Sequence, residues 1–255
     1  MLPTSRTEHC AHSIGKAPNV ILFLAANPSG TSRLAFDEEC AAIERELRMT
    51  DGRDDFDFRS KWAVTADEMM RHLNELCPMV IHFSGHGYSG TTGWSSTSRR
   101  HVQMVDSDDE IGGGIYLQDE YGNPQIVTAR ALKMMIKAAA ASARVVVLNA
   151  CYSSLQANAL RTIVDCVVGM TGAIRDDAAR SFAVGFYRAL GNRRSVGNAV
   201  EQAVATLAAK QLPDEHLPRC RTRKGVNAKQ LFLKERSGAG IVQNGLCSPY
   251  AQQDT

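Results

Sequence analysis

Two residues of this sequence have the side chains needed for nucleophilic catalysis, and the first is Cys151. It comes shortly after Val145–Leu148, four consecutive apolar and mostly β-branched residues. Such a run is typical of a strand buried on both faces of a parallel sheet. Cys151 then lies where the strand should give way to a helix, at the sheet edge where open α/β sheets bind ligands. A helix amino terminus would also lower the pKa of this thiol and make it a better nucleophile.

The second residue is His86, a candidate base. Met79–Gly87 reads Met-Val-Ile-His-Phe-Ser-Gly-His-Gly, a second buried-strand pattern that ends in a small-residue turn. If the two strands are neighbours, the His86 imidazole and the Cys151 thiol meet at one edge of the sheet. A lone cysteine more often fills core space, so the pair carries the prediction. His82 lies inside the strand, and we expect it to be a hydrogen-bonded core residue rather than a metal ligand.

Composition limits the classes of protein to consider. The chain has 255 residues, of which 44% are hydrophobic, enough for one domain with one core. The net charge of +2 does not favour nucleic acid or a membrane surface as a partner. The seven cysteines are scattered without a C-x-x-C pair, which argues against a disulfide framework or a thiolate zinc site. We expect a cytoplasmic protein with neither a metal nor a cofactor.

The periodicity predicts an alternation of strands and helices. A mostly parallel central sheet with helices on both faces follows from that alternation. The segment 56–64 has polar interruptions typical of an edge strand, 211–226 is expected to be irregular, and 230–233 is a candidate for a last edge strand. The other predicted strands are 19–26, 79–87, 145–148 and 165–170, with a β-hairpin at 114–117 and 125–127, and the predicted helices are 34–49, 66–76, 129–141, 155–162, 176–190 and 195–210.

Polar segments surround and interrupt the predicted domain, which spans 19–235. Residues 1–18 are expected to form a disordered leader and 236–255 a flexible tail, because neither shows periodicity. Residues 89–113, rich in Ser, Thr, Gly and Asp, are expected to form a polar insertion loop. Arg99-Arg100 within that loop has the composition of an activation cleavage site, although a plain surface insert is the interpretation we favour.

Two blocks of sequence resemble the CHAT family of caspase-like cysteine proteases, which are relatives of caspases, metacaspases and separase. They are His-Phe-Ser-Gly-His-Gly at 82–87 and Leu-Asn-Ala-Cys-Tyr-Ser at 148–153, and the similarity extends roughly from Val20 to Lys210. The resemblance implies a caspase-like three-layer sandwich and a cysteine endopeptidase with a histidine–cysteine dyad. It implies Cys151 as nucleophile, His86 as acid–base partner, and an oxyanion hole formed by the backbone N–H groups of Gly87 and Cys151.

The substrate pocket is the least defined part of the resemblance. Metacaspases carry an acid two residues before the nucleophile, where it receives a basic P1 side chain, but this sequence has Asn149 there. We therefore expect a neutral or apolar P1 residue. Asn149, Asp176 and Asp177 are candidates for the pocket. Asn149 could equally satisfy turn backbone groups, and acids at a helix start more commonly serve the helix dipole.

The resemblance also suggests a biological role, since CHAT proteases commonly act as effectors in bacterial defence. The implied partner is a specific protein substrate, for example a gasdermin-like pore-former, with a regulatory or sensor protein as a further partner. The leading alternative is a catalytically silent caspase-like interaction or scaffold module, against which the intact His86, Gly87 and Cys151 argue. A nucleotide-binding α/β module is disfavoured because neither G-x-x-x-x-G-K-[ST] nor G-x-G-x-x-G follows the first strand.

Overall fold

The computed structural model describes residues 18–90 and 113–233. The predicted leader, the Arg99-Arg100 segment and the tail therefore lie outside the described residues. Within the described ranges, no helix is both long and apolar enough to cross a bilayer.

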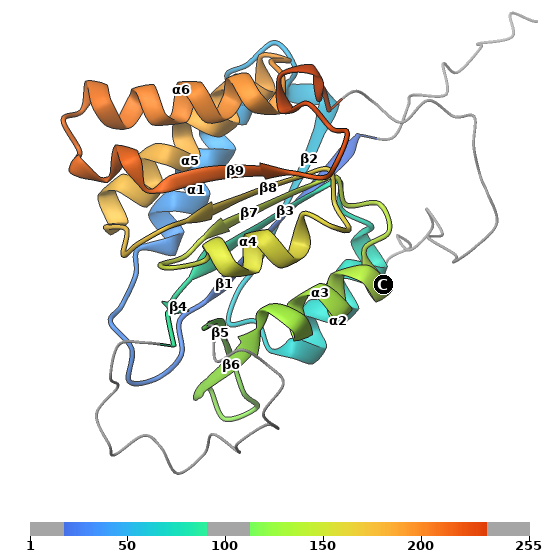
Figure 1. The fold of residues 1–255 in the computed structure, drawn as a ribbon, viewed down its shortest axis with the longest axis vertical. Coiled ribbons are helices and arrows are strands. Elements are labelled where there is room, and N and C mark those ends of the chain that lie inside the picture. Colours follow the sequence, from blue (N-terminus) through green and yellow to red (C-terminus); the bar gives the residue numbers. More distant parts are fainter. Residues whose placement is uncertain (1–17, 91–112, 234–255) are drawn as a thin grey trace, which may run out of the picture.

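A six-stranded sheet forms the centre of the molecule, with the strand order β2-β1-β3-β7-β8-β9 (Figure 1). The first five strands run parallel, and only β9, at one edge, is antiparallel to its neighbour. The strands are β1 Asn19–Ala26, β2 Phe56–Lys61, β3 Val80–Gly85, β7 Val145–Asn149, β8 Cys166–Met170 and β9 Pro218–Thr222. The predicted edge position of the second strand is confirmed, because β2 pairs with β1 alone among the described strands.

Helices cover both faces of the sheet, so the predicted three-layer sandwich is confirmed. The helices are α1 Phe36–Arg48, α2 Ala66–Leu76, α3 Ala129–Ala139, α4 Ser154–Leu160, α5 Asp176–Gly191 and α6 Val196–Ala209, with short 3₁₀ turns at Arg53–Asp55, Pro213–His216 and Ala228–Gln230. One apolar cluster joins the sheet to α1, α5 and α6, and a second cluster joins the other face to α2, α3 and α4 (Figure 1). Burial of apolar side chains on both faces explains why β1, β7 and β8 are mostly continuous hydrophobic runs.

Side-chain caps fix several helix starts where the sequence predicts them. Thr65 and Glu68 form a complete capping box at α2, and the Thr128 hydroxyl accepts a hydrogen bond from Ala131 N at the start of α3. The Ser195 hydroxyl accepts a hydrogen bond from Asn198 N at the start of α6. These caps satisfy N–H groups that the first helical turn leaves without a partner.

A small antiparallel sheet lies beside the large one. It contains β4 Gly87–Tyr88, β5 Gly114–Gln118 and β6 Pro124–Thr128, and β5 and β6 form the predicted hairpin. β4 follows β3 after a single residue, His86. The small sheet therefore holds the chain immediately after the candidate base.

The last edge strand is where the sequence prediction is wrong. Residues 230–233 form no strand, and β9 lies instead within 211–226, the segment predicted to be irregular. β9 carries Arg219 and Arg221, whose charges are typical of a solvated loop, and it is stabilised by pairing with β8. Cys166, the predicted core filler, is fully buried on β8, with its Sγ 3.1 Å from Cys220 Sγ on β9.

Candidate active site

The strands that precede the two candidate catalytic residues are neighbours, as the sequence predicts. β3 and β7 pair in parallel register, with Ser84 opposite Asn149. Their carboxyl ends reach the same edge of the sheet, and the chain turns just beyond them at His86 and Cys151. Both residues line one pocket of about 180 Å³ at this edge. The structure therefore brings the imidazole and the thiol into the wall of a shared cavity.

Gly87 is in direct backbone contact with the cysteine turn. A Cβ atom at this position would lie 1.8 Å from the carbonyl oxygen of Cys151, so no side chain fits. The Tyr116 N–H donates to the His86 carbonyl at 3.0 Å, which makes Gly87 and Ile115 a non-hydrogen-bonded pair of the small sheet. The Gly87 N–H consequently points away from β5.

The His86 ring is oriented by a backbone carbonyl. Its Nε2 lies 2.8 Å from the Ser32 carbonyl oxygen, in the loop between β1 and α1. A carbonyl only accepts hydrogen bonds, so Nε2 carries a proton, and in the neutral ring Nδ1 carries the lone pair. This assigns the basic nitrogen without an acidic third residue. The sequence could not reveal Ser32, because every residue has a carbonyl group.

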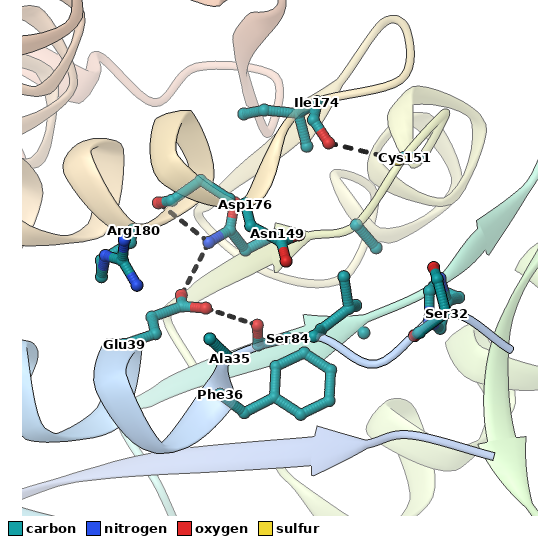
Figure 2. A pocket seen from close by; sticks show the side chains of 15 residues that line it. Ser32, Ala35, Phe36, Glu39, Ser84, Asn149, Cys151, Ile174, Asp176 and Arg180 are labelled. Atoms are coloured by element: carbon teal, nitrogen blue, oxygen red, sulfur yellow. Dashed lines mark hydrogen bonds between the residues drawn. The ribbon is translucent and has the colours of Figure 1, made fainter. Parts of the chain in front are cut away.

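The Cys151 thiol is held in its protonated form. Its Sγ donates to the Ile174 carbonyl at 3.7 Å, from the loop between β8 and α5 (Figure 2). Burial raises the pKa of the thiol, and the carboxylates of Asp176 and Asp214 act in the same direction. The predicted lowering of this pKa by a helix amino terminus is wrong, because burial raises the pKa and α4 begins only at Ser154.

Of the three residues predicted for the substrate pocket, two line the pocket and one does not. Asn149 and Asp176 belong to the pocket lining, whereas Asp177 does not. The Asp177 carboxylate accepts from Ala178 N at 2.8 Å and lies 3.7 Å from Arg175 Nε. Asp177 therefore serves the first turn of α5 rather than the pocket. Burial raises the pKa of Asp176, which the charge of His86 partly opposes.

Sequence reasoning missed Glu39, a carboxylate at the base of the pocket. Its side chain accepts hydrogen bonds from the Ser84 hydroxyl at 2.6 Å and from the Asn149 amide at 2.7 Å (Figure 2). It also accepts one from His82 at 3.0 Å. Burial alone would raise the pKa of this carboxyl, but these bonds and the His82 charge outweigh it and hold the pKa low. Helical spacing contained a signal, since position 39 lies three residues after Phe36 on the buried face of α1.

His82 is a core residue, as the sequence predicts. It is fully buried on β3, with Nδ1 3.0 Å from the Tyr187 hydroxyl and Nε2 3.0 Å from Glu39 Oε1. Its ring stacks on Phe23, with 5.2 Å between ring centroids. His82 thus connects α5, β3 and α1 beneath the pocket and takes no part in its lining.

Comparison with known proteins identifies the family. A family model described as the CHAT domain matches residues 1–221. The chain belongs to the CHAT-domain family. It is 26% identical over 202 residues to a Roc-COR-CHAT protease from an unknown prokaryotic organism, covering 76% of this chain and 17% of that protein. It is 22% identical over 174 residues to a protein from Gillisia limnaea named Probable protease, covering 68% and 27%. This CHAT-domain chain therefore spans well under a third of the length of either relative.

Two solved structures share the fold of this CHAT-domain chain. One is a secreted C11 cysteine protease from Bacteroides thetaiotaomicron in complex with an irreversible peptide inhibitor, with a TM-score of 0.50 and 13% identity over 76% of this chain and 60% of that one. The other is the Drosophila initiator caspase Dronc, with a TM-score of 0.51 and 8% identity over 86% of each chain. The predicted caspase-like fold is confirmed.

Proposed function

We propose that this chain is a cysteine endopeptidase in which Cys151 is the nucleophile and His86 the acid–base partner. The observation that carries the proposal is the shared pocket, into whose wall two adjacent parallel strands deliver a thiol and an imidazole. The backbone contact between Gly87 and Cys151 supports it, because the oxyanion donors implied by the family lie on these two residues. The protease names of the relatives agree with this chemistry.

The reaction begins when a substrate carbonyl displaces the thiol from its resting contact with Ile174. His86 Nδ1 takes the Sγ proton as the sulfur attacks the carbonyl carbon, and the Ser32 carbonyl stabilises the resulting imidazolium. The N–H groups of Gly87 and Cys151 stabilise the oxyanion. His86 then gives its proton to the departing amine, which leaves a thioester on Cys151.

Hydrolysis of the thioester restores the enzyme. Water attacks the acyl carbon while His86 Nδ1 takes one of its protons, and the sulfur leaves as the second tetrahedral species collapses. The proton returns from His86 to the sulfur, and the carboxylic acid product dissociates. No step needs a group beyond the dyad, the two backbone donors and water.

The test compares two cysteine variants on a fluorogenic peptide library. Cys151→Ala should abolish hydrolysis, while Cys220→Ala, which changes a half-buried cysteine away from the pocket, should retain it. His86→Ala should lower kcat/KM by at least about 100-fold, the usual contribution of a general acid–base. Equal hydrolysis by wild type and Cys151→Ala would end the proposal. A wild-type chain inert on every peptide would favour the silent scaffold module instead.

We further propose that the substrate is a specific protein in a bacterial defence pathway, such as a gasdermin-like pore-former, cut in the cytoplasm under the control of a regulatory or sensor protein. The support is the family itself and the match to one part of a much larger Roc-COR-CHAT protease. Co-expression with a candidate pore-former tests this role. Wild type should yield two fragments and Cys151→Ala none, and an intact candidate in both cultures removes that candidate.

A further inference from the structure

Two cysteines on neighbouring strands at one edge of the large sheet have their sulfur atoms in direct contact. Cys166 begins β8, and Cys220 lies in the middle of the edge strand β9 (Figure 1). Cys166 is opposite Thr222 and Cys220 is opposite Val168, so both thiols face the same side of the sheet. Their Sγ atoms are 3.1 Å apart, and both cysteines are free. A disulfide bond is about 2.05 Å long, so the sulfurs need to approach by only about 1 Å.

The two thiols differ in exposure and in acidity. Cys166 is fully buried, whereas Cys220 is partly exposed. The hydrogen bond from the Cys166 thiol lowers the pKa of Cys220 against the opposing effect of burial, and the charge of Arg221 adds to the lowering. The same hydrogen bond, together with burial, raises the pKa of Cys166. Cys220 is therefore the cysteine of the pair that forms a thiolate more readily and that solvent reaches first.

The segment that leads into β9 also holds the loop between β8 and α5, part of which lines the pocket of the proposed active site. The Leu217 carbonyl accepts hydrogen bonds from the N–H and the hydroxyl of Thr171, at 3.0 and 3.1 Å. The buried carboxylate of Asp214 accepts from the backbone N and from Nε of Arg175, at 3.3 and 2.9 Å. Thr171 and Arg175 are the two ends of this loop, so its position depends on the segment that precedes β9.

We propose that Cys166 and Cys220 form a reversible redox site, at which a hydroperoxide oxidises the pair to a disulfide that fixes β9 to β8. In the first step the Cys220 thiolate attacks hydrogen peroxide and breaks its O–O bond, which forms a sulfenic acid and releases hydroxide. The Cys166 sulfur then attacks the Cys220 sulfur, the S–O bond breaks, and the departing hydroxide takes the Cys166 proton. The two thiols lose two electrons and two protons, and the peroxide is reduced to two molecules of water.

The proposed disulfide would restrain a long segment of the chain. Its two cysteines are 54 residues apart in the sequence, and α5, α6 and the loop between β8 and α5 lie between them. Oxidation should therefore slow the opening of β9 and of the loop that the preceding segment holds. Transient disulfides of this redox-sensing kind also occur in reducing compartments. The proposal is independent of the proposed peptidase function, because it involves neither His86 nor Cys151.

The chemical test treats the folded chain with hydrogen peroxide and maps the linked peptides by mass spectrometry. Wild type should form a disulfide between positions 166 and 220 that dithiothreitol reverses. Cys166→Ala should instead accumulate a sulfenic acid at Cys220, which dimedone labels, whereas Cys220→Ala should give no dimedone label at the buried Cys166. The matched control is Cys40→Ala, which changes a buried cysteine of α1 outside the pair and should form the disulfide as wild type does.

Two results of the chemical test would overturn the redox site. One is the absence of the linked peptide in peroxide-treated wild type, and the other is its formation only after the chain is unfolded in urea. Both results come from wild type, so neither depends on whether a variant folds.

Hydrogen exchange measures what the disulfide does to the structure. In wild type, the amides of β9 and of Thr171 should exchange at least about tenfold more slowly after oxidation, and dithiothreitol should restore the faster exchange. Cys220→Ala should show no such change, which separates the effect of the disulfide from other effects of peroxide. Equal exchange in β9 before and after formation of the disulfide would overturn the proposal that it fixes this strand.

Discussion

At the scale of single residues, the Cys151 thiol lies among groups that oppose its ionisation. Burial, Asp176 and Asp214 raise its pKa, and the thiol donates a hydrogen bond to the Ile174 carbonyl. The His86 ring, by contrast, has a defined basic nitrogen because Ser32 binds the other one. The resting cysteine is therefore a neutral thiol, and its ionisation accompanies attack on the substrate.

The pH dependence of alkylation tests this resting state. Since only the thiolate reacts, the rate at which iodoacetamide modifies Cys151 should rise with pH, with a midpoint above the ordinary cysteine value of about 8.5. Asp176→Asn should move the midpoint downward, because it removes a carboxylate that raises the pKa. Intact-mass measurements against Cys151→Ala supply the rate and the background. A plateau reached below pH 7 would instead indicate a preformed thiolate–imidazolium pair.

Glu39 should contribute strongly to stability. Glu39→Gln removes the negative charge beside His82 and replaces one of the two acceptor oxygens with an NH2 donor that would face a buried donor, so the free energy of unfolding at pH 7 should fall by about 2–4 kcal/mol. The folded-state pKa is lowered, so this stabilisation is present above the unfolded value of about 4.3 and is lost as the pH falls through the folded value. Urea unfolding should show the gap between wild type and variant narrowing in acid.

The matched control is Glu38→Gln on the adjacent, exposed position. Glu38 pairs with Arg180 at the surface, and such pairs are worth at most about 1 kcal/mol. If the two variants unfold at the same urea concentration, the buried hydrogen-bond network of Glu39 does not stabilise the fold.

At the scale of secondary-structure elements, the site depends on how closely two strand ends approach. β3 and β7 are paired neighbours, and the turns that follow them touch through the backbones of Gly87 and Cys151. The small sheet then holds β4 on the far side of Gly87. The spacing of the two turns that follow β3 and β7 is thus set by main-chain packing rather than by side chains.

Gly87→Ala tests that packing. The added methyl group would overlap the Cys151 carbonyl, so the turns must separate, which should cost about 1–3 kcal/mol and lower kcat/KM by at least about 100-fold. Gly30→Ala is the control, since its φ of +77° brings backbone strain but its Cβ would meet no atom within 4 Å. That variant should lose up to about 2 kcal/mol of stability and keep its activity. Full activity in Gly87→Ala would contradict the contact.

At the scale of the whole molecule, the sequence predicts most of the layered fold and the two residues at its edge. Burial on both faces makes β1, β7 and β8 recognisable as apolar runs, and Thr65 and Thr128 mark helix starts with their own side chains. β9 was missed because an edge strand depends on its neighbour for pairing and keeps a polar composition.

The floor of the pocket was missed for a different reason. It assembles from α1, β3, β7 and α5, so the partners of Glu39 are 43 to 110 residues away in the chain. Local patterns carry no information about which distant strand an acid on α1 will meet. The sequence accordingly predicts the positions of His86 and Cys151 better than the remaining lining of the pocket.

The hydrogen bond from His86 to Ser32 has a consequence for how activity could be altered. The accepting oxygen belongs to the main chain, so a substitution of Ser32 leaves it in place. Site-directed mutagenesis would therefore not reveal its role. The orientation of the His86 ring depends on the backbone conformation of the loop between β1 and α1. A molecule that displaced this loop would remove the hydrogen bond that orients the His86 ring, without contacting His86 or Cys151.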